Sequence, residues 1–211
     1  MLDLAGAQLQ NAQTRIQVEE FRADASIPVR QGRLFVVKAG AVKTVWGDAR
    51  DDAAIIDFSF PGQVIGLESL VEVPTVHVDF RASISMTAVC HVRFNAKTAK
   101  RVSRQFCERL SAELAARIRS TYRHRQITKA GAQIRVAHFL IKVIRPDAMQ
   151  NIHGHYTVPN IARSDIASYL HMRTETLSRV LSEFRKKGWI RGPMHRIEVI
   201  DSGAIEMLAS T

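Results

Sequence analysis

The 211-residue chain is 46% hydrophobic, enough for one generous core or two modest ones, and it shows neither a membrane-spanning run nor the pattern of a secretory signal. We therefore expect a two-domain cytoplasmic protein without a membrane partner. Its net charge of +10 is uneven, because residues 1–96 hold 9 Lys or Arg against 11 Asp or Glu and residues 97–211 hold 21 against 9. A basic second half favours nucleic acid over a membrane surface as the partner, with a merely solvated basic surface as the alternative.

The first part of the chain has the composition of an antiparallel β domain. From Ile27 to Phe94, β-branched and aromatic residues form short runs that Gly, Pro and Asp interrupt. The runs that we interpret as strands lie at residues 34–37, 42–46, 55–58, 64–67 and, as one longer alternating segment, 77–94. Turn signals at roughly ten-residue spacing predict a small barrel or roll within residues 1–96.

A long helix is predicted next, within residues 97–130, where no Pro or Gly occurs. An apolar residue recurs every four positions, at Val102, Phe106, Leu110, Leu114 and Ile118. Such a stripe on a long helix favours packing against a second copy across a two-fold axis, which makes the chain a homodimer. The alternative is that the stripe covers the strand domain.

Residues 131–211 are predicted to hold a DNA-reading module. Three helices and a hairpin, or wing, are expected at residues 132–144, 163–170, 174–187 and 189–200. His171 and Met172 separate the second helix from the third, and Gly188 ends the third by the usual glycine termination. Two helices with a tight connection, followed by a wing, are typical of DNA recognition.

Three polar residues share one face near the start of the helix at 174–187. Glu175, Ser178 and Arg179 stand at positions i, i+3 and i+4. An arginine there can donate two hydrogen bonds to guanine, a glutamate can accept one from cytosine, and a serine is permissive. We predict that these three residues read bases. The alternative is an exposed ion pair between Glu175 and Arg179, worth a few tenths of a kcal/mol.

Cationic and hydroxyl side chains flank the base-reading face. They suit contacts with DNA phosphates, which add affinity without reading sequence. The predicted phosphate-binding residues are Arg173, Thr176, Arg185, Lys186, Lys187 and Arg191. The opposite, apolar face of the same helix is expected to pack on the domain.

These segments resemble the Crp/Fnr family, the bacterial transcription regulators related to the cyclic AMP receptor protein and the fumarate and nitrate reductase regulator. Residues 163–170, 174–181 and 184–188 carry the specific part of the resemblance, and 34–40 and 60–66 a weaker part. The resemblance implies an α+β chain with a cyclic-nucleotide-binding-like β-roll (1–96), a dimerisation helix (97–130) and a winged helix-turn-helix (131–211). It also implies double-stranded DNA with palindromic TTGAT-like half-sites, and RNA polymerase, as partners.

Two positions depart from the family pattern. His171 stands where the family usually has glycine in the turn, and Arg173 where Ser or Thr usually caps the recognition helix. Histidine tolerates a positive φ better than most residues, and a missing cap costs about 1 kcal/mol, so we still expect the motif to form.

The signal that the β-roll senses is not assigned by sequence. The cyclic-nucleotide branch has a glycine-glutamate pair and an arginine-serine pair, where this chain has Gly62-Gln63 and Arg81-Ala82. These differences disfavour cyclic AMP as the ligand. Arg81 could still meet a phosphate without the serine. The iron-sulfur branch needs four thiolates, and Cys90 matches one of them, but residues 1–89 contain no cysteine. We therefore predict no iron-sulfur cluster, and constitutive DNA binding stays possible.

The remaining reactive residues support no strong alternative. Cys90 is expected to be a small buried hydrophobic residue. A redox switch through the thiol of Cys107, or of Cys90, is an open alternative. Haem binding through His77 or His91 is disfavoured, because a lone strand histidine usually has a structural role. Without a CxxC, paired carboxylates, a phosphate loop or a nucleophile elbow, we expect neither a metal site nor an enzyme. A protein that coats nucleic acid without sequence preference remains the rival function.

Overall fold

The computed structural model describes residues 17–29, 32–47, 54–67, 78–93, 104–144, 155–193 and 196–210. The chain divides into two compact units, Met1–Arg119 and Ser120–Thr211, and the division falls within one long helix. Over the described ranges, none of the helices combines the length and the apolar character that a membrane crossing requires.

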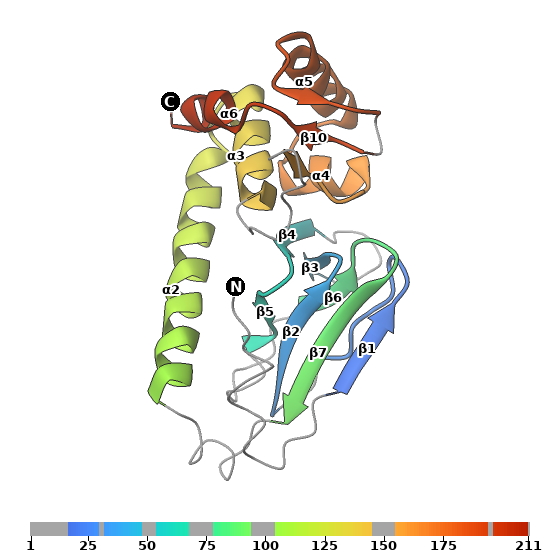
Figure 1. The fold of residues 1–211 in the computed structure, drawn as a ribbon, viewed down its shortest axis with the longest axis vertical. Coiled ribbons are helices and arrows are strands. Elements are labelled where there is room, and N and C mark those ends of the chain that lie inside the picture. The colour runs from blue at the N-terminus through green and yellow to red at the C-terminus, as the bar shows by residue number, and fades with distance from the viewer. Residues whose placement is uncertain are drawn as a thin grey trace. The chain divides into compact units, whose positions relative to one another are not determined.

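The first unit contains antiparallel β-sheets (Figure 1). Among the described residues, one sheet has the strand order β1-β7-β2-β5 and the other the order β4-β3-β6. The strands are β1 (Gln17–Phe21), β2 (Arg33–Ala39), β3 (Val42–Trp46), β4 (Ala54–Ser59), β5 (Val64–Ile65), β6 (Val78–Ala82) and β7 (Thr87–Arg93). Both sheets contribute to one buried cluster, which includes Phe35, Val42, Phe80 and Val89. The predicted antiparallel β-roll is confirmed.

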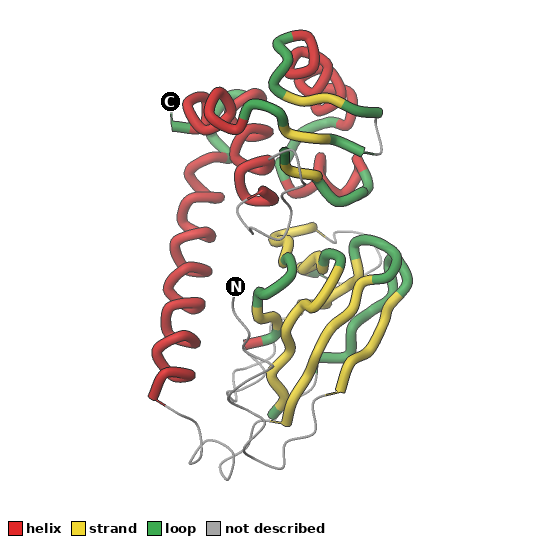
Figure 2. The backbone as a smooth tube through the Cα atoms, viewed as in Figure 1, coloured by secondary structure: helices red, strands yellow, loops and turns green. Residues whose placement is uncertain are grey.

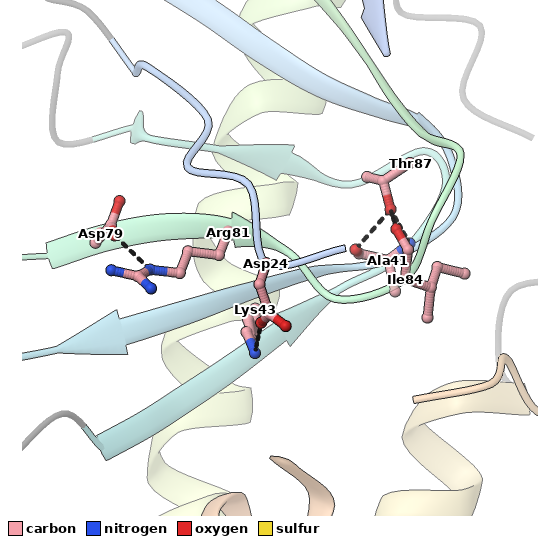
Figure 3. Close-up of polar contacts among 7 residues, drawn as sticks. All are labelled: Asp24, Ala41, Lys43, Asp79, Arg81, Ile84 and Thr87. Carbon is pink, nitrogen blue, oxygen red and sulfur yellow. Dashed lines mark hydrogen bonds and ion pairs between the residues drawn. The ribbon is translucent and has the colours of Figure 1, made fainter. Parts of the chain in front are cut away.

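Two details of the β-roll differ from the prediction. The segment 77–94 is not one strand, because a turn at residues 83–86 separates β6 from β7. Thr87 holds this turn, since its buried hydroxyl, with one proton to donate, lies 2.7 Å from the carbonyl oxygen of Ile84 and 3.1 Å from that of Ala41, as Figure 3 shows. The other difference is β1, which lies before Ile27, where the strand-rich segment was predicted to begin, and pairs with β7.

Helix α2 (Arg104–Ile127) is the predicted long helix, and its middle contacts the β-roll. Arg117 donates from Nη2 to the hydroxyl of Ser59 at 3.0 Å. Nearby, burial raises the pKa of Glu113, while Arg117 and a hydrogen bond from the backbone N–H of Val64 act in the opposite direction. The net direction means that the folded chain favours the neutral form of Glu113 more than an exposed glutamate would.

We expect the substitution Glu113→Gln to stabilise the protein at neutral pH. A carboxyl group with a raised folded-state pKa binds its proton more tightly when folded, so stability falls as pH rises from the ordinary range of Glu through the raised value. Glutamine keeps an acceptor oxygen for Val64 and removes the buried charge. The melting temperature of Glu113→Gln should exceed that of the wild type at pH 7 and approach it below about pH 4. Glu206→Gln, at an exposed glutamate of the second unit without an ion pair among the described residues, is the control. A lower melting temperature for Glu113→Gln at pH 7 would contradict the argument.

The second unit is a small helical domain with a three-stranded sheet (Figures 1 and 2). Its elements are α3 (Ala132–Ile144), β8 (Tyr156–Thr157), α4 (Arg163–Tyr169), α5 (Thr174–Lys186), β9 (Ile190–Arg191), β10 (Glu198–Val199) and α6 (Ser202–Ala209). Helix α3 has the predicted bounds, and α4 and α5 each end one residue earlier than predicted. The winged helix-turn-helix is therefore confirmed.

Two elements of this unit were not predicted. Strand β8 pairs with β10, so the wing is a three-stranded sheet of order β8-β10-β9 and not a two-stranded hairpin. Helix α6 begins where the carboxylate of Asp201 accepts a hydrogen bond from the backbone N–H of Ala204 at 2.8 Å, and it packs on α3 through the buried Ile205.

Candidate nucleic-acid interface

The turn between α4 and α5 is built around His171. This residue has φ of 50°, in the left-handed region, as expected for a position where glycine is usual. Arg173 precedes α5 in an extended conformation without a side-chain cap, so the missing cap is also confirmed. Sequence reasoning missed a third contributor, because Arg135 of α3 donates from Nη1 to the carbonyl oxygens of Leu170 (2.7 Å) and His171 (2.9 Å). A distant guanidinium thus holds the turn.

We expect Arg135→Met to lower the free energy of unfolding by about 2 kcal/mol. The substitution removes charge-assisted hydrogen bonds to two carbonyl groups while methionine keeps much of the aliphatic packing. Urea denaturation followed by far-ultraviolet circular dichroism would measure the change. Arg123→Met on the exposed surface of α2 is the matched control, and equal midpoints for the two variants would show that the turn does not depend on Arg135.

Helix α5 has one buried face and one exposed polar face. Leu177, Val180, Leu181 and Phe184 are buried, as predicted for the anchoring side. On the other side Glu175 and Arg179 are exposed and Ser178 is partly exposed. Within the described part of the chain, the side chains of Glu175 and Arg179 form no ion pair with each other or with any neighbour. The alternative of a Glu175–Arg179 ion pair is therefore not realised, and both groups stay available to a partner.

The predicted phosphate-binding residues fall into two groups. Arg173 and Lys186 are exposed and Thr176 is partly exposed. The other three also have structural contacts. Lys187 lies over the Trp189 ring at 4.5 Å, Arg185 donates from Nε to the Gly192 carbonyl at 3.2 Å, and Arg191 pairs with Glu198 at 2.8 Å. These contacts fix the wing beside the end of α5, so the cationic groups have defined positions.

The end of α2 packs on the helix-turn-helix. The ring of His124 is stacked on Tyr169 of α4, with centroids 4.3 Å apart and planes at 18°. Lys142 of α3 contacts the same tyrosine, with Nζ 3.2 Å from its hydroxyl oxygen. Because His124 belongs to α2 and Tyr169 ends α4, the two helices are joined by this aromatic contact.

Comparisons with known proteins agree with this geometry. A family model described as the Crp-like helix-turn-helix domain matches residues 134–208. The transcriptional regulatory protein btr of Bordetella pertussis is 26% identical over 204 residues, which cover 92% of this chain and 80% of the relative. The chain belongs to the Crp/Fnr family of transcription regulators.

Solved structures of this kind share the fold over nearly the whole chain. The structure of FixK2 from Bradyrhizobium japonicum superposes with a TM-score of 0.76 at 24% identity and covers 93% of this chain and 98% of the other. A CRP/FNR-family transcriptional regulator from Thermus thermophilus gives a TM-score of 0.66 at 20% identity, with 92% and 99% covered. The protein is thus a DNA-binding transcription regulator of the Crp/Fnr type, a non-enzymatic class, with a cyclic-nucleotide-binding-like first domain.

The apolar stripe of this Crp/Fnr protein is exposed on α2. Leu114 and Ile118 are 42% and 55% exposed, Leu110 is partly exposed, and Tyr122 continues the stripe at 66%. Val102 lies outside the described residues, and nothing is described of the Phe106 side chain. The β-roll of the same chain therefore does not bury Leu114 and Ile118, which disfavours the alternative that the stripe covers the strand domain.

The residues considered for sensing in the Crp/Fnr β-roll have internal contacts. Cys90 is buried as predicted, and burial raises the pKa of its thiol, with Lys38 acting in the opposite direction. Arg81 donates from Nε to Asp79 at 2.7 Å (Figure 3), so its guanidinium already contacts a carboxylate of the same strand. His77 lies outside the described residues. Over the described ranges, no three His, Cys, Asp or Glu residues group as metal ligands.

Both ring nitrogens of His91 have a partner. Nε2 lies 2.6 Å from a carboxylate oxygen of Glu19, and Nδ1 lies 3.2 Å from Nη1 of Arg33. Because an arginine can only donate, Nδ1 is the acceptor and the proton of a neutral ring sits on Nε2, facing the carboxylate. His91 is 5% exposed and joins β7 to β1 and β2. This is a structural role of the kind expected for a strand histidine.

Proposed function

We propose that this regulator is a homodimer that reads a palindromic site in double-stranded DNA with Glu175, Ser178 and Arg179 of each protomer. The observation that carries the proposal is the two-faced helix α5, which anchors four apolar side chains and leaves Glu175 and Arg179 exposed, without an ion-pair partner among the described residues. Arg179 suits guanine O6 and N7, Glu175 suits cytosine N4, and Ser178 is permissive. The resemblance to the Fnr-like branch adds the expectation of TTGAT-like half-sites.

Backbone contacts supply most of the affinity in this proposal. The phosphate-binding set is Arg173, Thr176, Arg185, Lys186, Lys187 and Arg191. Its members surround the base-reading face from the start of α5 to the wing, and cationic contacts of this kind release counterions from DNA. Sequence preference then comes from the base contacts alone.

The assembly follows from the exposed stripe on α2. The proposed division is a sensor domain in residues 1–96, a dimerisation segment in residues 97–130 and a DNA-binding domain in residues 131–211. The proposed interface residues are Val102, Phe106, Leu110, Leu114 and Ile118. A two-fold axis along the helix places two recognition helices on half-sites about one helical turn apart. As a transcription regulator, the dimer would have RNA polymerase as its second macromolecular partner.

Selection of bound DNA from a random duplex library with the full chain tests the proposal directly. The expected result is a palindrome with two equal half-sites about one helical turn apart. Recovery of unenriched sequence, with equal affinity for all duplexes, would favour a nucleic-acid-coating protein instead. The same selection with and without cyclic AMP tests the further proposal that no cofactor or cyclic nucleotide is required.

A redox-responsive regulator is the second candidate function, and the exposed thiol of Cys107 favours it. Cys107 lies on α2 one turn from Leu110 and two turns from Leu114, on the same side as the stripe. Peroxide would then join two protomers through a Cys107 disulfide and change DNA affinity, and Cys107→Ser would abolish both effects. Unchanged affinity and the absence of a crosslinked dimer would exclude this candidate. Cys90 is less suited, because its thiol is buried.

A further inference from the structure

The outward face of the wing sheet carries one carboxylate among several cationic or titratable side chains. Glu198 lies on the central strand β10, directly opposite Arg191 of β9 and Thr157 of β8. Arg196 and His155 lie just before β10 and β8, and their contacts with Glu198 and Arg191 place them on the same side of the sheet. The apolar residues Ile190, Ile197 and Val199 are buried on the other side of the sheet.

The contacts on this face centre on Glu198. Its Oε2 accepts from Nε of Arg191 at 2.8 Å, and its Oε1 lies 4.0 Å from Nε of Arg196. The hydrogen bond from Arg191, together with the charges of Arg191 and Arg196, lowers the pKa of Glu198, so this carboxyl group is charged at neutral pH. Nδ1 of His155 lies 3.5 Å from Nη2 of Arg191 on the adjacent side.

The exposure of these groups shows which of them solvent or a ligand can reach. The side chain of Glu198 is 17% exposed, whereas those of Arg191 and Arg196 are 57% and 68% exposed. The guanidinium groups of Arg191 and Arg196 therefore cover the carboxylate and expose their outer edges to solvent. Among the described residues, Nη1 of Arg191 has no hydrogen-bond partner, so its fork retains donors for a second anion.

We propose that Glu198 is a positioning residue for DNA binding, which aligns Arg191 and Arg196 so that both contact backbone phosphates beside the recognition helix. The proposal rests on the proposed function, goes beyond it by adding Arg196 and Glu198, and concerns affinity and not base reading. A planar guanidinium can bind a carboxylate along one edge and a phosphate along the other, and fixing its orientation in advance reduces the entropy lost on binding. The Arg185 contact with the Gly192 carbonyl keeps this face beside the end of α5.

The sign of one substitution distinguishes positioning from simple repulsion. A carboxylate that merely lies near DNA repels phosphates, so its removal tightens binding. Removal of a positioning carboxylate weakens binding even though the net charge becomes more positive. We expect Glu198→Thr to weaken the binding of the full chain to duplex DNA about threefold or more, which is roughly the affinity that one phosphate contact is worth. Threonine is chosen because it is well tolerated in a strand.

The salt dependence and a double-mutant cycle provide two further measurements by fluorescence anisotropy. The slope of log affinity against log salt should become shallower by about 1 for each phosphate that the protein no longer neutralises. In the background Arg191→Ala plus Arg196→Ala, Glu198→Thr should no longer weaken binding, because nothing remains to be positioned. Glu206→Gln, which removes an exposed carboxylate from α6 of the same unit, is the charge-matched control and should not weaken binding.

Tighter or unchanged binding by Glu198→Thr, with an unchanged salt slope, would overturn the proposal. Melting temperatures identify a variant that fails to fold, and Glu198→Gln, which keeps an acceptor for Arg191, should then show a smaller loss of affinity of the same sign. The loss should be equal on the selected site and on a random duplex of the same length. The effect of Glu198→Thr on random duplex can be measured even if no specific site is found, so failure of this proposal can be distinguished from failure of the proposed function.

Discussion

Replacement of Arg179 by alanine is expected to weaken binding to the selected palindrome by about 1–3 kcal/mol for each guanine that is no longer recognised, or roughly fivefold to 150-fold. The guanidinium is exposed, lies one turn from Glu175 and has no ion-pair partner in the described part of the chain, so its deletion removes a DNA contact without leaving a buried group unsatisfied. Binding to random duplex should change little. Anisotropy titrations with the two duplexes at one salt concentration measure the difference.

Two companion variants isolate the base contact. Lys186→Ala removes an exposed cation from the last turn of the same helix, and it should weaken binding to both duplexes about equally, because a phosphate contact carries no sequence information. Arg179→Lys keeps the charge but loses the planar fork, so it should resemble Arg179→Ala on the palindrome. Equal losses on both duplexes for Arg179→Ala and Lys186→Ala would contradict the division between base-reading and phosphate-binding residues.

The second unit could be predicted from sequence in most of its helices because its local signals agree. Leu177, Val180, Leu181 and Phe184 follow the helical period and are all buried in α5. Gly188, with φ of 75°, ends that helix as the sequence indicated. His171 adopts a left-handed conformation although glycine is usual there, so the turn tolerates the substitution as expected.

Other features could not be predicted, because their causes are distant in sequence. The strand β1 has four exposed side chains in succession, so no alternation marks it, and pairing with β7 defines it. The turn between β6 and β7 contains neither Gly nor Pro and depends on Thr87, which bonds Ala41, 46 residues away. Arg135 reaches the turn before α5 from 35 residues away. Glu198 resembles an ordinary strand residue in the sequence, which does not reveal the pairing that places Arg191 opposite it.

A pair of charges on the exposed stripe should separate the two protomers. The double variant Leu114→Glu plus Ile118→Glu places like charges at i and i+4, where two copies of α2 would meet. We expect this variant to be a monomer by light scattering at micromolar concentration and the wild type to be a dimer. Affinity for the full palindrome should fall about 100-fold or more, because the second half-site is no longer bound at a high effective concentration.

The matched control makes this result specific to the stripe. Ala112→Glu plus Ala116→Glu adds the same charges at the same spacing, but on exposed positions roughly opposite the stripe, so it should remain dimeric and bind the palindrome almost as tightly as the wild type. Affinity for an isolated half-site should be similar in all three proteins, since α5 and the wing are unchanged. A stripe variant that stays dimeric would mean that α2 does not form the interface, and a monomeric wild type would mean that there is no dimer to read two half-sites together.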